Sequence, residues 1–452
     1  MTIDEFIDLV SGQFLDLSEP LNRDTHFHEV PSWDSMTALA IVEEVKSNCG
    51  VVIDLQQMKR AVTIEDLYKL VMGKQLGGKQ GQSEVEEHHA TLADLAISTY
   101  GHEYEDRFGF LSQARGMLRT LHANPFVADA GKDLCVLWAS KQGIVFGGNV
   151  NLPGEINVHG TVYKTLVSSN TFVAEDFRST GFGLELWERC VVRAPHGLVS
   201  ASSCSQMKVK LSQSTNCTVF LFPRYVMLSK SRSVVEQKVK GAAGKLLSVI
   251  ADCALMVYWM LIGLYARIKT FGLQISRVKP DDEDALAAVE AIVLSEQKEC
   301  QEVHDRKWFK WMMSESFSKD GPNELFVVKT HGKVVAFVMM KKRFHDHASH
   351  RGYKNVWLGS IMEWGAVLPY KKKIPSLLIR LAVKLRPKVD AVEILATESD
   401  VEVHLRHLLW RHVGDGNFIF KLSATSPLKT MDTVLKQENW RLRPAMGDAG
   451  LI

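Results

Sequence analysis

The sequence has few cysteines, and they are not paired along the chain. Seven cysteines are spread over 452 residues without a Cys-x-x-Cys motif. This spacing does not support a disulfide framework, and it favours cysteines that act as small buried side chains. The chain also begins without the pattern of a secretory signal peptide. Together these absences predict a cytoplasmic protein kept in a reducing environment.

The sequence also lacks a dense basic stripe, which argues against a nucleic-acid partner. Its small net charge of +2 conceals an uneven distribution. Residues 1–72 contain 13 acidic and 5 basic side chains, whereas the rest of the chain contains 39 acidic and 49 basic ones. Opposite charges of this kind favour docking of the acidic part of the chain on the basic part.

Long apolar runs are scarce, and one stands out at residues 246–266. Its length would suffice to cross a bilayer. Asp252 lies within the run, and segments typical of soluble domains flank it, so a membrane span is not favoured. We therefore expect residues 231–272 to form a helical connector whose helix is buried between domains. Peripheral membrane contact is the alternative.

The first 72 residues show the pattern of a small helical bundle. Thr2 and Glu5 form a capping box before an apolar stripe, and Thr63 is placed to cap a later helix. Asp34 and Ser35 stand where a polar loop meets an amphipathic helix. A serine hydroxyl at a helix N-terminus lies where backbone N–H groups favour a phosphate. Ser35 is therefore a candidate site for a phosphodiester, and an ordinary N-cap is the alternative.

Several short motifs extend this pattern, namely Trp33-Asp34-Ser35-Met36, Glu43-Glu44, Val51-Val52-Ile53-Asp54 and Val62-Thr63-Ile64-Glu65-Asp66-Leu67. On these motifs, residues 1–73 resemble an acyl carrier protein domain. The resemblance implies an all-α four-helix bundle in which Ser35, beside Asp34, carries a covalent 4′-phosphopantetheine. It also implies a phosphopantetheinyl transferase as a partner, because such an enzyme attaches the group.

Residues 74–90 lose the apolar periodicity and contain repeated glycine, lysine and glutamine. This composition predicts a flexible linker whose root-mean-square span is about 20 Å. A domain on a linker of that span has an effective concentration of roughly 1 mM at a neighbouring site in the same chain. A carrier domain on such a linker would reach an active site in the same chain.

A second informative motif begins with a predicted strand that ends at Phe172 and Val173. A turn and a predicted helix follow. Glycines in such a turn let backbone N–H groups converge on an anion at the helix N-terminus. The turn is a candidate pyrophosphate site, and a generic strand-to-helix turn is the alternative. Its residues are Arg178, Ser179, Thr180, Gly181, Phe182 and Gly183.

This strand, the Arg-x-x-Gly-x-Gly turn and the helix resemble the signature of the GNAT acetyltransferase superfamily. The resemblance assigns residues 91–230 to a GNAT-like acyltransferase domain that uses acyl-CoA or acetyl-CoA. It implies that the turn at 178–183 binds the pyrophosphate and that the strand ending at 172–173 binds the pantetheine arm. One departure concerns residues 200–207, which lack the tyrosine that protonates the departing thiolate in many members.

Residues 273–452 repeat a similar order of strands and helices, with a predicted hairpin around His331 and helices at 374–385 and 401–413. They resemble a second, degenerate GNAT-like domain, because the turn at 368–375 contains lysines instead of a glycine pair. The expected fold class is therefore multidomain. An all-α carrier bundle precedes a tandem GNAT-like acyltransferase fold of the α/β (α+β) type.

A general base is needed to deprotonate an ammonium group, and carboxylates near predicted strand ends are candidates. They are Glu155, Glu363, Glu398 and Asp400. No metal site is expected, because the histidines at 345, 347 and 350 share one loop without a second ligand cluster.

The sequence thus predicts an N-acyltransferase of GNAT type that acts in a biosynthetic pathway. The acyl group would pass from a pantetheine thioester, on the carrier domain or on CoA, to a small-molecule amine. Acyl-loading or downstream biosynthetic enzymes would be its partners. Two alternatives remain at this stage. The chain could be a non-catalytic scaffold that presents a thioester to external synthases, or a CoA-dependent acetyltransferase with a vestigial carrier domain.

Overall fold

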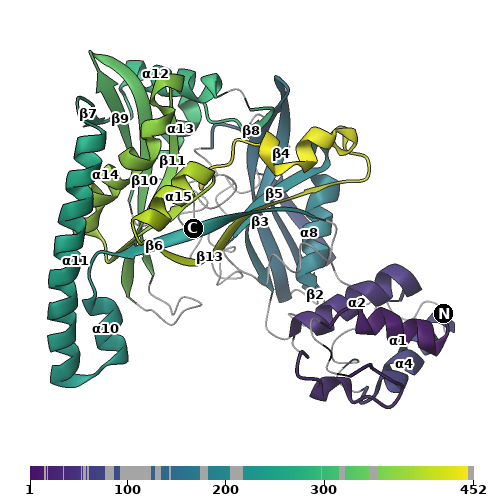
Figure 1. Ribbon diagram of the computed structural model, residues 1–452. Coiled ribbons are helices and arrows are strands. Elements are labelled where there is room, and N and C mark those ends of the chain that lie inside the picture. The colour runs from purple at the N-terminus through teal and green to yellow at the C-terminus, as the bar shows by residue number, and fades with distance from the viewer. Residues whose placement is uncertain are drawn as a thin grey trace.

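The computed structural model consists of a small helical part followed by one large mixed sheet covered by helices (Figure 1). It describes residues 1–14, 17, 19–33, 35–51, 53, 58, 61–76, 86–91, 124–127, 134–141, 144–173, 182–203, 217–296, 298–314, 321–345 and 355–445.

The N-terminal part has a hydrophobic core of its own, in which Phe6, Phe27, Ile41 and Leu67 are fully buried. Its elements are α1 (Ile3–Ser11), the 3-10 helix η1 (Phe27–Glu29), α2 (Ser35–Cys49) and α4 (Ile64–Leu76). The predicted capping box is confirmed, because Thr2 accepts from the Glu5 N–H and Glu5 accepts from the Thr2 N–H. Its described residues contain three α-helices, so a four-helix bundle stays a prediction.

Regular elements reach into both ends of the predicted linker 74–90. The helix α4 continues to Leu76, and the strand β1 begins at Glu86. Residues 77–85 lie outside the described part of the chain, so the flexible linker stays a prediction.

Thirteen strands form the sheet, in the order β1-β2-β3-β4-β5-β13-β6-β12-β11-β10-β9-β7, with β8 paired to β3. The strands are β1 (Glu86–Thr91), β2 (Leu134–Lys141), β3 (Ile144–Val158), β4 (Thr161–Val173), β5 (Leu198–Ser203), β6 (Thr218–Leu228), β7 (Gln274–Arg277), β8 (Cys300–Glu302), β9 (Glu324–Thr330), β10 (Lys333–His345), β11 (Val356–Ala366), β12 (Ala391–Leu395) and β13 (Arg411–Leu422).

The helices that cover the sheet are α8 (Phe182–Arg193), α10 (Arg232–Lys238), α11 (Gly241–Lys269), α12 (Glu283–Ser295), α13 (Arg306–Met312), α14 (Ile374–Leu385) and α15 (Ser399–His407). The predicted helix at 374–385 and the hairpin at His331 are confirmed. The predicted helix at 401–413 is too long. It ends at His407, because the chain turns through Leu409 at a positive φ and enters β13 at Arg411.

The two halves of the sheet are related by a shared arrangement at its centre. Each half contributes one parallel pair, β4 with β5 and β11 with β12. The last strand of each half then pairs with the other half, since β13 lies against β5 and β6 lies against β12. The strands β6 and β13 pair with each other, antiparallel, in the middle of the sheet. The predicted domains 91–230 and 273–452 therefore share one continuous sheet.

The expectation that residues 246–266 form a buried interdomain helix is wrong. They belong to α11, which runs along the outside of the molecule beside α14 (Figure 1). Trp259, Ile262 and Ala266 are buried against the core. Apolar residues occur on all sides of the helix in this run, however, whereas packing against one neighbouring element needs only one stripe of the helix surface. Leu255 and Tyr258 are partly buried against the same core, and most of the other large apolar side chains of α11 are exposed.

The central strand β13 provides a test of this arrangement. Phe420 is almost fully buried among the rings of Phe220, Phe418 and Trp440. Phe420→Ala should lower the free energy of unfolding by about 3–5 kcal/mol through the cavity it leaves. Because β13 connects both halves, urea denaturation followed by the fluorescence of the tryptophans of the sheet, in a Trp33→Phe background, should show one transition that moves as a whole. Val192→Ala, at an exposed position on α8, should have almost no effect. Movement of only part of the transition would contradict the shared core.

Candidate functional site

The parallel strands β4 and β5 remain together over a very short distance. Leu166 pairs with Val199 and Val167 pairs with Ser200. Beyond these two pairs β4 continues to Val173 and β5 to Ser203, and within these described segments they no longer pair with each other. Each strand keeps its other neighbour, β3 and β13 respectively. The sheet therefore opens into a gap after Val167.

The corresponding gap in the second half is filled by the C-terminal segment. Strands β11 and β12 pair as far as Ile361, and the backbone of β11 then accepts bonds from elsewhere. The Met362 carbonyl accepts from the Ala445 N–H, and the Trp364 carbonyl accepts from the side chains of Arg441 and Arg443. The two gaps thus differ, since the chain itself occupies the second one.

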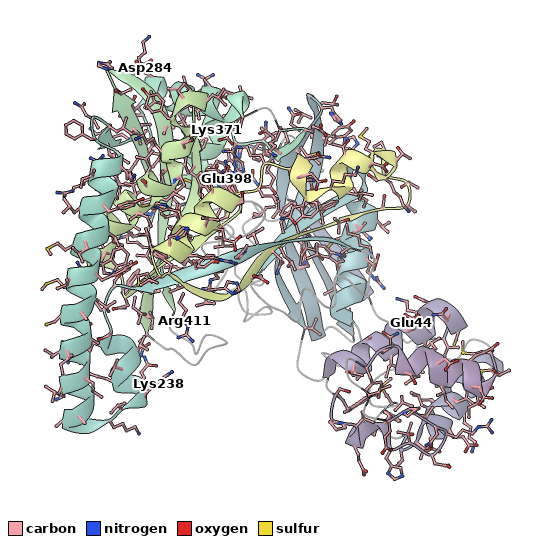
Figure 2. The ribbon with its side chains drawn as sticks, viewed as in Figure 1. Glu44, Lys238, Asp284, Lys371, Glu398 and Arg411 are labelled. Atoms are coloured by element: carbon pink, nitrogen blue, oxygen red, sulfur yellow. The ribbon has the colours of Figure 1, made fainter. Side chains whose placement is uncertain are left out.

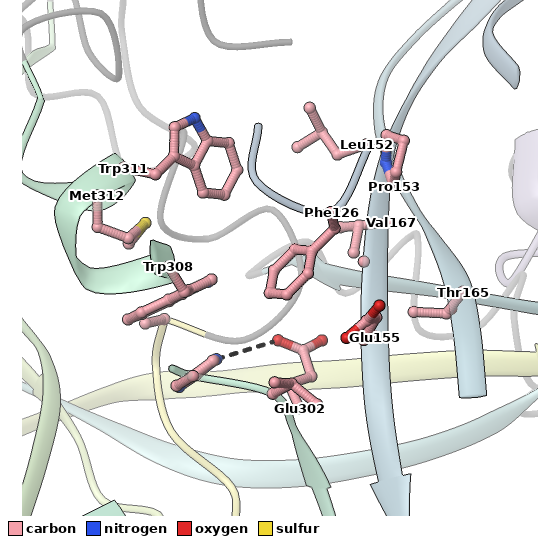
Figure 3. Close-up of a pocket in the computed structure, with 14 residues that line it drawn as sticks. Phe126, Leu152, Pro153, Glu155, Thr165, Val167, Glu302, Trp308, Trp311 and Met312 are labelled. Carbon is pink, nitrogen blue, oxygen red and sulfur yellow. Dashed lines mark ion pairs between the residues drawn. The ribbon is translucent and has the colours of Figure 1, made fainter. Parts of the chain in front are cut away.

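A pocket lies beside the first gap, between β3, β4 and the segment that links β8 to α13 (Figure 3). Its empty volume is about 450 Å³, which includes its opening to solvent. Val167, the last residue of β4 that pairs with β5, is part of its wall, so the pocket adjoins the gap. It is lined by Phe126, Leu152, Pro153, Gly154, Glu155, Thr165, Val167, Glu302, Val303, His304, Trp308, Trp311, Met312 and Ala445.

The pocket combines aromatic walls with carboxylates. In Figure 3 the rings of Phe126, Trp308 and Trp311 form one side, and the carboxylates of Glu155 and Glu302 lie on another. Burial, followed by the nearby charge of Asp305, raises the pKa of Glu155 above its ordinary value. A carboxylate with a raised pKa is a better proton acceptor near neutral pH.

His304 connects the pocket to a buried ion cluster. Its Nδ1 lies 2.8 Å from Oε2 of Glu363, and its Nε2 faces Oε2 of Glu302 at 3.6 Å, too far for a hydrogen bond. The Trp308 ring stacks on the imidazole, with 3.7 Å between the ring centroids. Nε2 is buried and has no hydrogen-bond partner in the part of the chain that the structure describes. A buried polar atom without a partner is costly, so this edge of the pocket favours a polar ligand.

The ion cluster itself is shielded from water. Arg441 contacts Glu363 at 2.6 Å and also pairs with Glu296, and Arg443 contacts both Glu296 and Glu398. Burial would raise the pKa of Glu363, but the charges of Arg441 and then of His304 outweigh it and lower this pKa to about 2. Burial likewise would lower the pKa of His304, but the charge of Glu363 outweighs it, and the pKa is raised.

The predicted base candidates fall into two places. Glu155 lines the pocket. Glu363 and Glu398 both belong to the ion cluster, and Asp400 follows Glu398 in the first turn of α15. The pKa of Glu398 is lowered, because the charge of Arg443 outweighs its burial, whereas burial and Glu398 raise the pKa of Asp400. Only Glu155 among these four contributes to the wall of the pocket.

The predicted cofactor-binding residues are described in part. Phe172 and Val173 end β4, as expected, and Phe182 and Gly183 begin α8. Ser35 is the first residue of α2. Asp34, Arg178, Ser179, Thr180 and Gly181 lie outside the described residues. The described parts of the chain contain no cluster of His, Cys, Asp or Glu side chains that could hold a metal ion.

Sequence analysis missed His304 and Glu302. Glu302 ends β8 and His304 lies between β8 and α13, far along the chain from the strands β3 and β4 that line the same pocket. A single histidine between two acidic side chains gives little signal in a sequence. The nearby pair Trp308 and Trp311 was the available sign, because aromatic residues often line ligand pockets.

Comparisons with known proteins identify solved structures of similar fold. No protein-family model matches the sequence, and no curated protein matches it either. A structure of Saccharomyces cerevisiae N-myristoyltransferase with bound myristoyl-CoA matches with a TM-score of 0.50 at 12% identity, over 76% of this chain and 83% of that one. A second structure of that enzyme with myristoyl-CoA gives 0.50 at 13%, over 76% and 80%.

The chain has an N-acyltransferase fold. The predicted acyltransferase fold is thereby confirmed, and at this level of identity the likeness concerns the fold alone. A GCN5-related N-acetyltransferase from Anabaena variabilis also matches, with a TM-score of 0.43 at 9% identity over 75% of this chain and 73% of that one.

The raised pKa of His304 predicts a pH dependence of stability. A protonated His304 stabilises the fold fully below about pH 6.5, the ordinary value, and this contribution is lost as the pH rises through the higher pKa of the folded state. The wild-type protein should therefore lose more free energy of unfolding than His304→Asn between about pH 6 and pH 9. Urea denaturation at both pH values measures the difference. Equal losses in the two proteins would contradict a charged His304.

Proposed function

We propose that this chain is an N-acyltransferase that passes an acyl group from a pantetheine thioester to an amine in the pocket. The observation that carries the proposal is the junction at Val167, where the gap between β4 and β5 meets the pocket wall. A thioester held in the gap would present its carbonyl carbon to a nucleophile in the pocket. Transfer requires such close placement of the two reactants.

A buried polar group near the gap supports a ligand with amide groups. Ser200 is 1% exposed, and its hydroxyl has no hydrogen-bond partner among the described residues. It pairs with Val167 where the strands separate. An amide of a pantetheine arm would supply the missing partner, which favours this ligand because an unpaired buried group costs free energy.

The pocket supports an amine acceptor. An ammonium group would be attracted by Glu155 and Glu302, and an apolar or aromatic portion would contact Trp308 and Trp311. Glu155, with its raised pKa, would take the proton from the amine. The neutral nitrogen then attacks the thioester carbon, a C–N bond forms, the C–S bond breaks, and the thiolate leaves with the electron pair. The nitrogen loses its second proton, which neutralises the thiolate to the free thiol.

The donor would be acyl-CoA or a phosphopantetheine carried on Ser35. The matching S. cerevisiae structures hold myristoyl-CoA, which favours a CoA thioester as one source. The separate core of residues 1–76 and the position of Ser35 at the start of α2 favour a carrier domain as the other. The carrier would need a phosphopantetheinyl transferase and acyl-loading or downstream enzymes as partners, in a cytoplasmic biosynthetic pathway.

The carrier part of the proposal predicts a change in mass. Incubation with CoA and a promiscuous phosphopantetheinyl transferase should add one phosphopantetheine to the wild-type protein and none to Ser35→Ala. Intact-mass spectrometry reads out both results. Modification of Ser35→Ala would place the group elsewhere, and no modification of the wild type would leave CoA as the donor.

The pocket part of the proposal predicts a specific loss of catalysis. Glu155→Gln should lower kcat for amide formation from acyl-CoA by about 10²-fold, because the base is removed. In the wild type, kcat should rise with pH through the raised pKa of Glu155, and this dependence should vanish in the variant. Release of free CoA thiol with a panel of aromatic and aliphatic amines measures the rate. Glu438→Gln, at an exposed site, is the control, and an unchanged kcat in Glu155→Gln would contradict the assignment.

A further inference from the structure

The helix α11 exposes a broad apolar face to solvent. Ten of its large apolar side chains are 48–65% exposed. At 100° per residue they fall within one half of the helix circumference, opposite the side that holds Trp259 and Ala266. They are Leu246, Leu247, Val249, Ile250, Met256, Val257, Met260, Leu261, Leu264 and Ile268. Phe271, just beyond the helix, is 92% exposed and continues the face.

This exposure exceeds what a soluble surface normally carries. Among the described residues, α11 alone is long and apolar enough to cross a membrane, and only 17% of its most apolar window is buried. Contiguous apolar surface of this kind marks a site that contacts a partner or a membrane. The helix is also the outermost element on its side of the molecule, so nothing in the described chain covers this face (Figure 1).

The opposite side of α11 is bonded to the protein along its length. Asp252 accepts from the Ser231 N–H, Trp259 donates to the Leu228 carbonyl at 2.8 Å, and Tyr258 donates to the Leu408 carbonyl. Crossing a bilayer would break these contacts and would bring the attached domain into the membrane. The contacts also turn Asp252, the acidic residue of the apolar run, away from the exposed face. They are compatible with a helix that lies in the plane of a membrane surface.

Basic residues stand at both ends of the apolar face. The segment 230–245, which includes α10 and the start of α11, contains five lysines and arginines, among them Lys238 (Figure 2), and one acidic residue, Glu236. Glu236 pairs with Arg232. Arg267 and Lys269 follow at the other end of the helix. An acidic stretch at residues 281–284 comes after that end, so the strongest positive charge lies at the α10 end of the face.

We propose that α11 docks this protein on an anionic lipid surface, with its exposed apolar face among the lipid headgroups and the basic segment 230–245 against their negative charge. Basic juxtamembrane residues are attracted to anionic lipids, and an apolar helix face adds burial in the interface. A second copy of the chain fits this face less well. In a parallel pair of α11 helices, the basic segments 230–245 of the two copies would lie side by side, and their like charges would repel each other. The inference does not depend on acyl transfer.

Vesicle flotation tests the proposal on the full-length chain. Wild-type protein should float with phosphatidylcholine vesicles that contain about one-fifth phosphatidylserine, and weakly with phosphatidylcholine alone. The double variant Ile250→Glu/Met260→Glu should lose at least tenfold in binding, because both side chains are exposed and leave the core intact. The double variant Lys240→Gln/Lys245→Gln should lose about tenfold or more on anionic vesicles.

Matched controls separate this surface from general effects of charge. Val192→Glu places one glutamate at a 77% exposed position on α8 and should float like the wild type, whereas Ile250→Glu alone should already weaken binding. Absence of wild-type flotation would overturn the proposal. A wild-type dimer in gel filtration that Ile250→Glu/Met260→Glu converts to a monomer, without flotation, would overturn it in favour of a second copy. Amide formation is assayed separately, so its failure would leave the flotation result intact.

Discussion

The pairing of β6 with β13 in the middle of the sheet is the constraint on which the rest of the structure depends. Strand β6 follows the first half along the chain but pairs with β12 of the second half. Strand β13 follows the second half along the chain but pairs with β5 of the first. The exchange fixes the distance between the two parallel pairs that flank it. It also brings the segment from β8 to α13, which belongs to the second half, onto strands β3 and β4 of the first. The pocket exists because of this crossing, since both halves supply its walls.

The two halves share a topology but differ in what fills the gap after each parallel pair. In the second half, Arg441 and Arg443 enter the gap and neutralise Glu296, Glu363 and Glu398. Buried charges of this kind are tolerated only when they are paired. Because the arginines are needed to pair these carboxylates, the cluster has a structural role in this half. The first half has no such plug in its described residues and retains unpaired buried groups such as Ser200. This asymmetry explains why one gap is suited to a ligand and the other is not.

Local features of the chain were predictable, and long-range ones were not. The capping box at Thr2, the end of β4 at Val173 and the hairpin at His331 follow from a few neighbouring residues. The exchange of β6 and β13 has no local signal, and it overrides the helical pattern that extends past His407. The exposed face of α11 was missed for a related reason. Hydrophobicity alone does not tell how much of an apolar helix the neighbouring elements cover.

The central claim is that an acyl thioester lies between β4 and β5 with its carbonyl facing the pocket. A crystal structure with a non-transferable thioether analogue of an acyl-pantetheine tests this most directly. The account predicts the sulfur beside Val167, an amide of the arm bonded to Ser200, and the acyl group directed toward Glu155. Density for the arm between β11 and β12, with Arg441 displaced, or at any site away from Val167, would contradict it.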